Sequence, residues 1–361
     1  MSILLFFLVL LVLVIAHEFG HFIIAKQAGI RVDEFAFGFP PRLGSITKGE
    51  TRYSFNALPF GGYVKIYGEN PDEVEDNADK KRAFNNQPRL IQGAVIVAGV
   101  VFNLLLAWLL ISATLMLGIT APLGGGHTLT DQRIMVSGIH PGSPAEASGL
   151  LPGDILLTVA DGAESTEVTS PDSVSSFVAP RFEHPLSFTY RRDGKTLSTN
   201  ITPVSGIVTD KAAIGIYMDI VGTLKLPVHL AVLEGFNKTY QYTILTATGL
   251  WDFFSSVITG KSDFSQVTGP VGIVGAVGEA ANISFANFLL FTALISINLA
   301  VINVIPFPAL DGGRLLFIII EAIMRRPINV KVANMTNLVG FSLLMLLMLV
   351  VTWHDIAKLL H

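Results

Sequence analysis

The segment AHEFGH, residues 16–21, places two histidines and a glutamate at the end of a long apolar run. His17 and His21 are four residues apart, so on a helix both imidazoles project from one face and can ligate a single metal ion. Glu18 lies beside them and can take a proton from a water molecule there. Zinc held by two histidines and a carboxylate keeps a fourth position open, activates water and polarises a carbonyl. The pattern therefore predicts zinc-dependent hydrolysis of a peptide bond, with Glu18 passing the proton to the leaving amine.

A zinc site with only two histidines needs a third ligand from elsewhere in the chain. The best candidate is Asp311 in the segment NVIPFPALDGG, a single carboxylate at the end of another uncharged block. Pro306 and Pro308 interrupt the helix there, and membranes tolerate such free backbone only where protein buries it or a wet cavity adjoins it. The alternative is an ordinary interfacial turn in which Asp311 caps a helix that starts at Gly312.

The apolar surroundings of the histidines strengthen the metal hypothesis. Ionisable side chains cost roughly 2.5 to 3.5 kcal/mol each at the centre of a membrane helix, so three close together need a compensating partner. A metal ion supplies that partner. The alternative is a polar cluster that reaches water at the cytoplasmic end of the span, and it is weakened because the apolar run continues over residues 22–25.

Composition predicts a membrane protein independently of these motifs. Of the 361 residues 51% are hydrophobic and only 14% are charged. The apolar residues come in blocks long enough to cross a hydrocarbon core, which needs about 20 helical residues. We expect an α-helical polytopic membrane protein whose four transmembrane helices have rough cores at 2–25, 91–119, 285–305 and 333–353. The first block could instead be a secretory signal peptide, but no positive charge precedes it.

Basic residues orient these spans. The loop 26–89 holds ten Lys or Arg residues, and the loop 312–331 holds four. The positive-inside bias places both loops in the cytoplasm and both termini outside. The large insert between the second and third spans then also lies outside.

One further apolar stretch, residues 228–260, decides whether the metal ligands can meet. It contains Glu234, Lys238 and Asp252, so we expect an amphipathic helix on the outer surface and not a fifth span. The first and third spans then run in the same direction, and the His17 end of one lies at the same depth as the Asp311 end of the other. A fifth span would put Asp311 near the opposite face.

The insert, residues 128–225, changes character to short strands and turns. It predicts a strand, a short helix over 145–148, a second strand from Ile155 and a hairpin at Asp193-Gly194. The insert resembles a bacterial PDZ domain, and the alternative is another β-rich domain. The hallmark runs of that domain are present as Gly142-Ser143-Pro144-Ala145, Gly149-Leu150 and Gly153-Asp154. PDZ domains hold extended peptides at a sheet edge, for which Ile214-Gly215-Ile216 is the candidate strand.

The whole chain resembles the bacterial site-2 proteases, the intramembrane zinc metalloprotease family that includes the RseP-type regulators of envelope stress. The resemblance covers nearly the whole length and rests on separate motifs in the family's order. These motifs are HEFGH at 17–21, FGGYVK at 60–65, AGVVFNLLLA at 98–107, the PDZ-like insert, TGPVGI at 268–273, and the run from Asn303 through Asp311-Gly312. One departure is Val100, which stands where the family usually has a proline and puts the local kink in doubt more than the chemistry.

The resemblance implies a set of site residues. His17, His21 and Asp311 would bind one zinc ion, and Glu18 would be the general base. Asn103 would help to hold substrate or transition state, and Asn303 would contact the substrate helix.

Asn103 fits its implied role on its own chemistry. An amide in an apolar helix needs a hydrogen-bond partner and can donate to a developing oxyanion. Its alternative role is a hydrogen bond between membrane helices.

The expected substrate is a transmembrane segment of another protein, which must unwind because helical peptide bonds are shielded. Residues 50–68 show strand-like alternation in 51–55 and 63–67, and the edge of this β-hairpin could pair with an unwound substrate. Gly61, Gly62 and Tyr63 are the expected contacts. The alternative is a plain cytoplasmic hairpin, whereas the family resemblance implies a loop that dips into the membrane.

These inferences divide the chain into an N-terminal membrane part (1–127), a PDZ domain (128–225), a surface helix with linker (226–282) and a C-terminal membrane part (283–361). We expect a multi-pass protein of the bacterial inner membrane with the PDZ domain on the periplasmic side. Its substrates would be single-span proteins, such as an anti-sigma factor or a signal-peptide remnant, trimmed beforehand by another protease. The outer PDZ domain could exclude untrimmed ectodomains.

Two other classes of function compete with a protease. A PDZ-bearing membrane scaffold would hold a structural metal, but such a site has no use for Glu18. A transporter would carry polar residues further along its spans, and the first and fourth spans have almost none. The net charge of −4 argues neither for nor against nucleic acid, and we expect no nucleic-acid partner.

Overall fold

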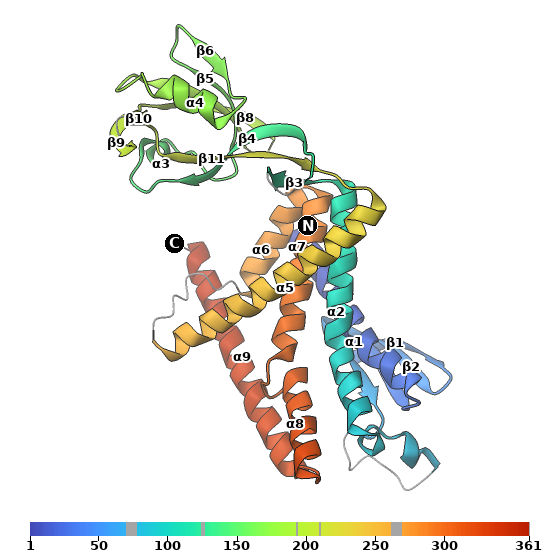
Figure 1. The fold of residues 1–361 in the computed structure, drawn as a ribbon. Coiled ribbons are helices and arrows are strands. Elements are labelled where there is room, and N and C mark those ends of the chain that lie inside the picture. The colour runs from blue at the N-terminus through green and yellow to red at the C-terminus, as the bar shows by residue number, and fades with distance from the viewer. Residues whose placement is uncertain (70–77, 124–126, 193, 209–210, 261–268, 361) are drawn as a thin grey trace. The chain divides into compact units, whose positions relative to one another are not determined.

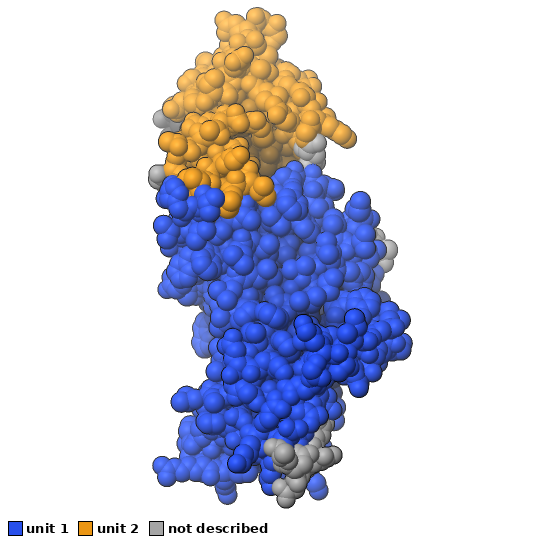
Figure 2. All heavy atoms as spheres, turned by 90° about the vertical axis from the view of Figure 1, so that its right-hand side faces the viewer, with its two compact units in different colours: residues 1–114, 228–361 blue, residues 115–227 orange. Residues whose placement is uncertain are grey.

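The computed structural model of the 361-residue chain describes residues 1–69, 78–123, 127–192, 194–208, 211–260 and 269–360 (Figure 1). The chain forms two compact units, which Figure 2 colours separately. The first consists of Met1–Thr114 and Val228–His361, and the second of Leu115–Pro227. The predicted limits of the insert, 128 and 225, fall inside the second unit.

Four helices in the described part of the chain are long and apolar enough to cross a membrane. They are α1 (Ser2–Gln27), α2 (Arg89–Leu117), α7 (Phe285–Val304) and α9 (Val330–Leu360). Each contains one of the four spans expected from the sequence, apart from a residue or two at its ends. The prediction of a polytopic membrane protein with four apolar helices is confirmed.

Helix α5 (Val228–Ile258) is not among those four. It packs on α2, where Trp108 Nε1 donates to the Val232 carbonyl at 2.8 Å and the Trp108 ring meets Phe236 edge-on. Large apolar side chains on it are exposed, including Leu245 and Trp251. Its placement on the membrane surface stays a prediction.

Two shorter helices complete the C-terminal part of the first unit. Helix α6 (Pro270–Ile283) begins where the Asp355 carboxylate of α9 accepts the backbone N–H groups of Gly269 and Gly272, at 3.0 and 2.9 Å. Thr268 of the TGPVGI motif lies outside the described residues. Helix α8 (Asp311–Met324) follows α7 after a non-helical turn, and the two 3₁₀ turns η2 (Ala78–Arg82) and η3 (Phe84–Asn86) precede α2.

A small antiparallel sheet follows α1, formed by β1 (Val32–Lys48) and β2 (Thr51–Ile66). Both long strands fold back on themselves, so residues 32–39 pair on one side with 52–58 and on the other with 62–66. Residues 42–48 pair with 51–56 as the other outer segment. The expected direct pairing of 51–55 with 63–67 as a hairpin is therefore wrong. The two segments are both strands, but residues 32–37 lie between them.

The second unit is built on a β-sheet with the strand order β3-β11-β4-β5-β7-β8. Its sheet strands are β3 (Ile119–Pro122), β4 (Thr130–Ile139), β5 (Ile155–Ala160), β7 (Leu186–Arg192), β8 (Lys195–Ile201) and β11 (Ile216–Leu224), with β6 (Ser165–Glu167) paired to β5. The strands β9 (Val204–Val208) and β10 (Lys211–Ala213) pair separately. Helices α3 (Pro144–Ala147) and α4 (Pro171–Val178) complete the unit, and its core includes Phe188, Leu186 and Leu156.

Local predictions for this unit hold where they can be checked. The expected short helix over 145–148 is α3, one residue earlier, and the strand from Ile155 is β5. Strands β7 and β8 pair up to Arg192 and Lys195, as expected of the hairpin, although Asp193 of its turn lies outside the described residues. The assignment of this unit to the PDZ family stays a prediction.

Candidate metal centre

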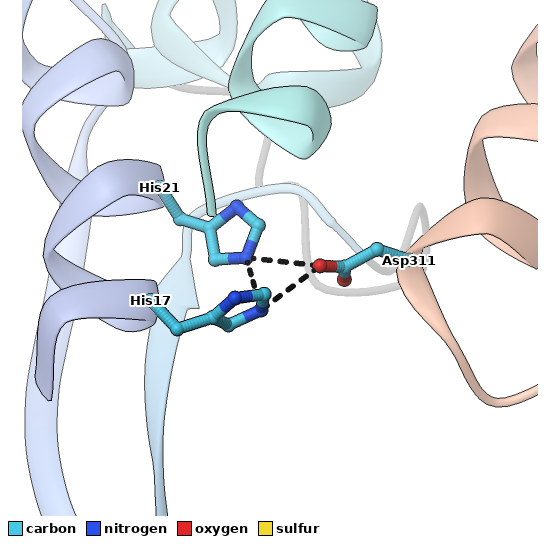
Figure 3. A group of neighbouring side chains, drawn as sticks. All are labelled: His17, His21 and Asp311. Carbon is cyan, nitrogen blue, oxygen red and sulfur yellow. Dashed lines mark hydrogen bonds and ion pairs between the residues drawn. The ribbon is translucent and has the colours of Figure 1, made fainter. Parts of the chain in front are cut away.

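Three side chains from distant parts of the sequence meet at the C-terminal half of α1. His17 and His21 extend from one face of α1, and Asp311 extends from the first residue of α8 (Figure 3). Asp311 Oδ2 lies 3.0 Å from His17 Nε2 and 3.3 Å from His21 Nε2, and the two Nε2 atoms are 3.2 Å apart. The structure thus brings together the three residues that were selected as metal ligands.

The triangle of donor atoms has the size of a zinc coordination shell. Zinc–ligand bonds of about 2.0 to 2.1 Å in tetrahedral geometry hold two ligand atoms roughly 3.3 to 3.4 Å apart. The three observed separations are 3.0 to 3.3 Å. Asp311 Oδ2 is buried without a hydrogen-bond partner in the described part of the chain, as a carboxylate oxygen reserved for a cation would be. These residues therefore fit one zinc ion.

Helix α2 supports both imidazoles from behind. His21 Nδ1 lies 2.8 Å from the Val95 carbonyl oxygen, and His17 Nδ1 lies 3.1 Å from Asn103 Nδ2. Val95, Gly99 and Asn103 are spaced by four, so they form one stripe along α2 that faces the two histidines. Val95 contacts His21, Asn103 contacts His17, and Gly99 lies between them against both rings.

Glycines let the two helices approach at this stripe. A Cβ atom at Gly20 would meet the Ala98 carbonyl, and one at Gly99 would overlap the rings of both His17 and His21. No larger residue fits at either position without movement of backbone or ligand. Val95 and Gly99 were not predicted from the sequence, although a glycine four residues before Asn103 on the same helix face was a signal for the second of them.

A non-helical turn brings Asp311 to the histidines. Helix α7 ends at Val304, and the prolines at 306 and 308 prevent its continuation. The turn folds tightly onto the start of α8, because Cβ atoms at Gly312 and Gly313 would meet carbonyls of residues 304–307. Asp311 lies in the first turn of α8, as the alternative of an interfacial cap also expected, but its carboxylate is directed at the imidazoles.

A cavity of about 420 Å³ opens beside the three ligands. The side chain of Glu18 lines it together with the ligands, and Tyr63 to Ile66 of the strand β2 form another wall. Arg314 and Glu69 pair with each other and also line a smaller neighbouring cavity of about 140 Å³. Arg314 and Glu69 were not predicted from the sequence, because a salt bridge between remote segments leaves no local pattern.

The remaining predicted site residues lie at different distances from this cavity. Tyr63 lines it, and Gly62 lies against α1, where an added Cβ would come within 3.0 Å of Val14 and 3.6 Å of Glu18 Cγ. Gly61 packs beside the Phe39 ring instead. Asn103 is fully buried behind His17, and Asn303 lies in the last turn of α7; neither is among the residues that line the cavity. The substrate roles of these residues stay predictions.

Comparisons with known proteins identify the family of the chain. The family model of peptidase family M50 matches residues 5–347, which is nearly the whole chain. The chain belongs to peptidase family M50. It is 33% identical to a putative zinc metalloprotease of Clostridium perfringens, with 95% of each chain covered. It is also 30% identical to the regulator of sigma-W protease RasP of Bacillus subtilis, with 96% of each covered, and 29% identical to zinc metalloprotease RasP of Oceanobacillus iheyensis, with 98% of each covered.

Family membership confirms the expected activity and cofactor. This M50 peptidase is a site-2-type zinc metalloprotease, and its converging ligands explain how the metal would be held. The family consists of peptidases, and Glu18 lies in the cavity beside the ligands. Both findings favour the protease over a scaffold with a structural metal.

Proposed function

We propose that this M50 peptidase hydrolyses peptide bonds in transmembrane segments of single-span membrane proteins, using Glu18 as general base. The observation that carries the proposal is the 420 Å³ cavity, because the three metal ligands, Glu18 and an edge strand of a β-sheet all line it. Both histidines belong to α1, which is apolar enough to span a membrane, and Asp311 follows the turn after α7, which is also apolar enough to span one. A substrate at this site is therefore a peptide that can enter lipid.

The three metal ligands and Glu18 would each have one role in the reaction. His17, His21 and Asp311 would hold the zinc ion, which when bound would activate a water molecule and polarise the scissile carbonyl. Glu18 would accept the proton that the attacking water loses and would give it to the nitrogen of the leaving amine. The C–N bond then breaks, and the products are a carboxylate and an amine.

Residues 61–66 of β2 are the proposed binding edge for the unwound substrate. One side of this segment pairs with β1, as in Phe35 with Val64 and Phe37 with Gly62. Its other side borders the cavity, where the backbone N–H of Val64 faces the Glu18 carboxylate. A substrate strand added at this edge would be extended, with its peptide bonds accessible beside the metal ligands.

The sheet carries an apolar surface that supports the proposed dip into the membrane. Exposed large apolar side chains lie on its two strands, at Phe39, Leu43, Ile46, Phe55 and Leu58. Exposed apolar side chains of this number are unfavourable in water and suit contact with lipid.

Replacement of Glu18 tests the chemistry. In Glu18→Gln, we expect cleavage of a single-span test substrate to fall by about 10² to 10⁴-fold, because general acid–base catalysis is lost. The zinc content should not change, since Glu18 is not a ligand. Glu50→Gln, a carboxylate at the β1–β2 turn, serves as the matched control and should cleave normally. Cleavage by zinc-loaded Glu18→Gln at the wild-type rate would refute the mechanism.

Cysteine cross-linking tests the binding edge, and the chain contains no cysteine of its own. In the Glu18→Gln background, a cysteine in the unwound part of the substrate should form a disulfide with Lys65→Cys. The control is Ile46→Cys on the opposite outer segment of the sheet, which should not react. Equal cross-linking at both positions would argue against strand addition at residues 61–66.

The second unit is proposed to be a PDZ domain outside the cytoplasm that excludes untrimmed substrates. Its support is a groove of about 350 Å³ between α4 and the start of β11, lined by Ile214, Gly215 and Ile216 of the predicted binding strand. Residues 216–219 pair with β4 on one side and have no strand partner among the described residues on the other, which leaves that side for a peptide. An impermeant thiol reagent should label Ser165→Cys from outside and Arg326→Cys only after the membrane is opened.

Deletion of residues 128–225 tests the exclusion role. It should allow cleavage of untrimmed substrates, and continued resistance of those substrates would count against exclusion by this unit.

A further inference from the structure

Asn103 contacts the back of a metal ligand. It is fully buried on α2, and its Nδ2 lies 3.1 Å from Nδ1 of His17, the ring nitrogen that faces away from Asp311. Its Oδ1 is buried and has no hydrogen-bond partner within the described residues. Asn103 does not line the 420 Å³ cavity. Its amide therefore meets the ligand and not the space where substrate would lie.

Zinc ligation decides which nitrogen of His17 carries the hydrogen. A neutral imidazole binds a metal through the nitrogen that has no hydrogen, so ligation through Nε2 puts the hydrogen on Nδ1. An N–H at Nδ1 needs an acceptor, and an amide nitrogen cannot serve as one. His21 meets this condition, since its Nδ1 lies 2.8 Å from the Val95 carbonyl oxygen.

The Asn103 side chain can meet the same condition by a half-turn of its amide. The two ends of the amide have nearly the same shape, so the turn exchanges Oδ1 and Nδ2 without disturbing the packing. In the structure Nδ2 meets His17 Nδ1 and Oδ1 has no partner among the described residues, so this contact alone does not decide the orientation. The ligation chemistry does, because only Oδ1 can accept from His17 Nδ1–H.

We propose that Asn103 is a positioning residue whose Oδ1 accepts a hydrogen bond from His17 Nδ1–H and so fixes the tautomer and ring orientation that zinc requires. Val95 does this for His21 with a backbone carbonyl, and Asn103 does it for His17 with a side chain two stripe positions further along α2. Partners of this kind typically control metal affinity by 10- to 100-fold. The inference rests on the zinc site of the proposed mechanism.

Zinc affinity of the purified full-length protein, measured by competition with a chelator, tests the proposal. Asn103→Leu removes both amide groups at similar size, and we expect affinity to fall about 10- to 100-fold. Asn103→Asp keeps an acceptor but loses the donor, so its affinity should stay within about threefold of wild type. Ser296→Ala is the matched control, because Ser296 Oγ donates to the Asn103 backbone carbonyl at 2.8 Å without reaching the ring. Its zinc affinity should not change.

Two results would overturn the proposal. Equal losses in Asn103→Asp and Asn103→Leu would mean that the amide nitrogen, and not the oxygen, makes the contact. Unchanged zinc affinity in Asn103→Leu, with cleavage reduced about 10² to 10³-fold, would instead mark Asn103 as an oxyanion donor. If Asn103→Leu does not fold, Asn103→Ala gives the same comparison with Asn103→Asp. Failure of the protease mechanism itself would appear separately, as cleavage by Glu18→Gln.

Discussion

The histidine half and the aspartate half of the metal centre are held in different ways. His17 and His21 stand on one continuous helix, and groups of α2 contact the far nitrogen of each ring. Asp311 stands at the start of α8 after a non-helical turn. Its buried Oδ2 lies 3.0 Å from His17 Nε2 and 3.3 Å from His21 Nε2.

This difference predicts which changes each half should tolerate. The rings are oriented by specific groups on a facing helix, so the histidine half depends on close contact between α1 and α2. The carboxylate is oriented by the path of its own backbone, so the aspartate half depends on the turn that packs under Gly312 and Gly313. A change at the helix contact displaces a ligand directly, whereas a change in the turn acts through the backbone.

The largest effect is expected at Gly99. In Gly99→Ala the new Cβ would overlap the rings of His17 and His21, so we expect zinc affinity to fall by more than about 100-fold, beyond the usual effect of an outer-sphere change. Gly93→Ala on the same helix is the control, because its Cβ would meet only Leu315 Cδ1, at 3.7 Å. That control should bind zinc normally and gain up to about 1 kcal/mol of helix stability. Normal zinc binding by Gly99→Ala would mean that the α1–α2 contact is not rigid.

A smaller loss is expected at Gly312. In Gly312→Ala the added Cβ would meet the carbonyl oxygens of Val304 and Ile305, and the start of α8 must shift. We expect a loss of zinc affinity of about 10-fold, because Asp311 moves while both histidines stay in place. Gly275→Ala in α6, where the Cβ has open space, is the control. A loss at Gly312 as severe as that at Gly99 would show that the two halves are equally rigid.

The same difference explains what the sequence could predict. His17, Glu18 and His21 follow from a spacing of four on any helix, so no tertiary knowledge was needed. Asp311 required only a carboxylate next to a helix break at the right depth. The support from Val95 and Gly99 could not be predicted, because α2 is mostly apolar on every side and its periodicity does not mark the face that meets α1.

The strand β1 was missed for a related reason. Its buried positions over 32–38 are Val32, Glu34, Ala36 and Gly38, while the aromatic residues 35, 37 and 39 occupy the other face. The alternation of large and small side chains over 35–39 is a strand signal, but it would have assigned the aromatic face to the interior. The buried Glu34 is held by Arg42, at 2.9 Å, and by the Ser54 hydroxyl, contacts that only the folded sheet provides.

Asn337 should have a weaker effect, on the aspartate half only. Its Oδ1 accepts the backbone N–H of Ala309 at 3.3 Å, in the turn where Ala309 has a left-handed φ of 73°. Loss of one such bond in Asn337→Ala should cost about 0.5 to 1.5 kcal/mol of stability and lower zinc affinity by less than about 10-fold. Thr336→Ala, whose hydroxyl bonds only within its own helix, is the control. A zinc affinity in Asn337→Ala below that of Gly312→Ala would contradict the assigned order.

The smallest effect concerns Glu50, which joins the end of α1 to η2. Its carboxylate accepts from Arg82 at 2.7 Å and from Lys26 at 2.6 Å, and these bonds lower the pKa of Glu50 to about 2 from its ordinary 4.5. Because the folded pKa is the lower one, the stabilisation is complete above about pH 4.5 and is lost as the pH falls toward about 2. The pair is partly exposed, so its contribution at pH 7 should stay below about 1 kcal/mol.

Thermal unfolding of Glu50→Gln and of wild type, compared at each pH, isolates this contribution from the effect of acid on the metal centre. We expect a small deficit in melting temperature at pH 7 that shrinks as the pH falls below about 4.5. Glu167→Gln, an exposed carboxylate in β6, should show no such trend. Zinc affinity should be unchanged, because Glu50 anchors α1 beyond the two histidines and makes no contact with α2 in the described structure. A zinc defect in Glu50→Gln would mean that the histidine half depends on the end of α1 as well as on its contact with α2.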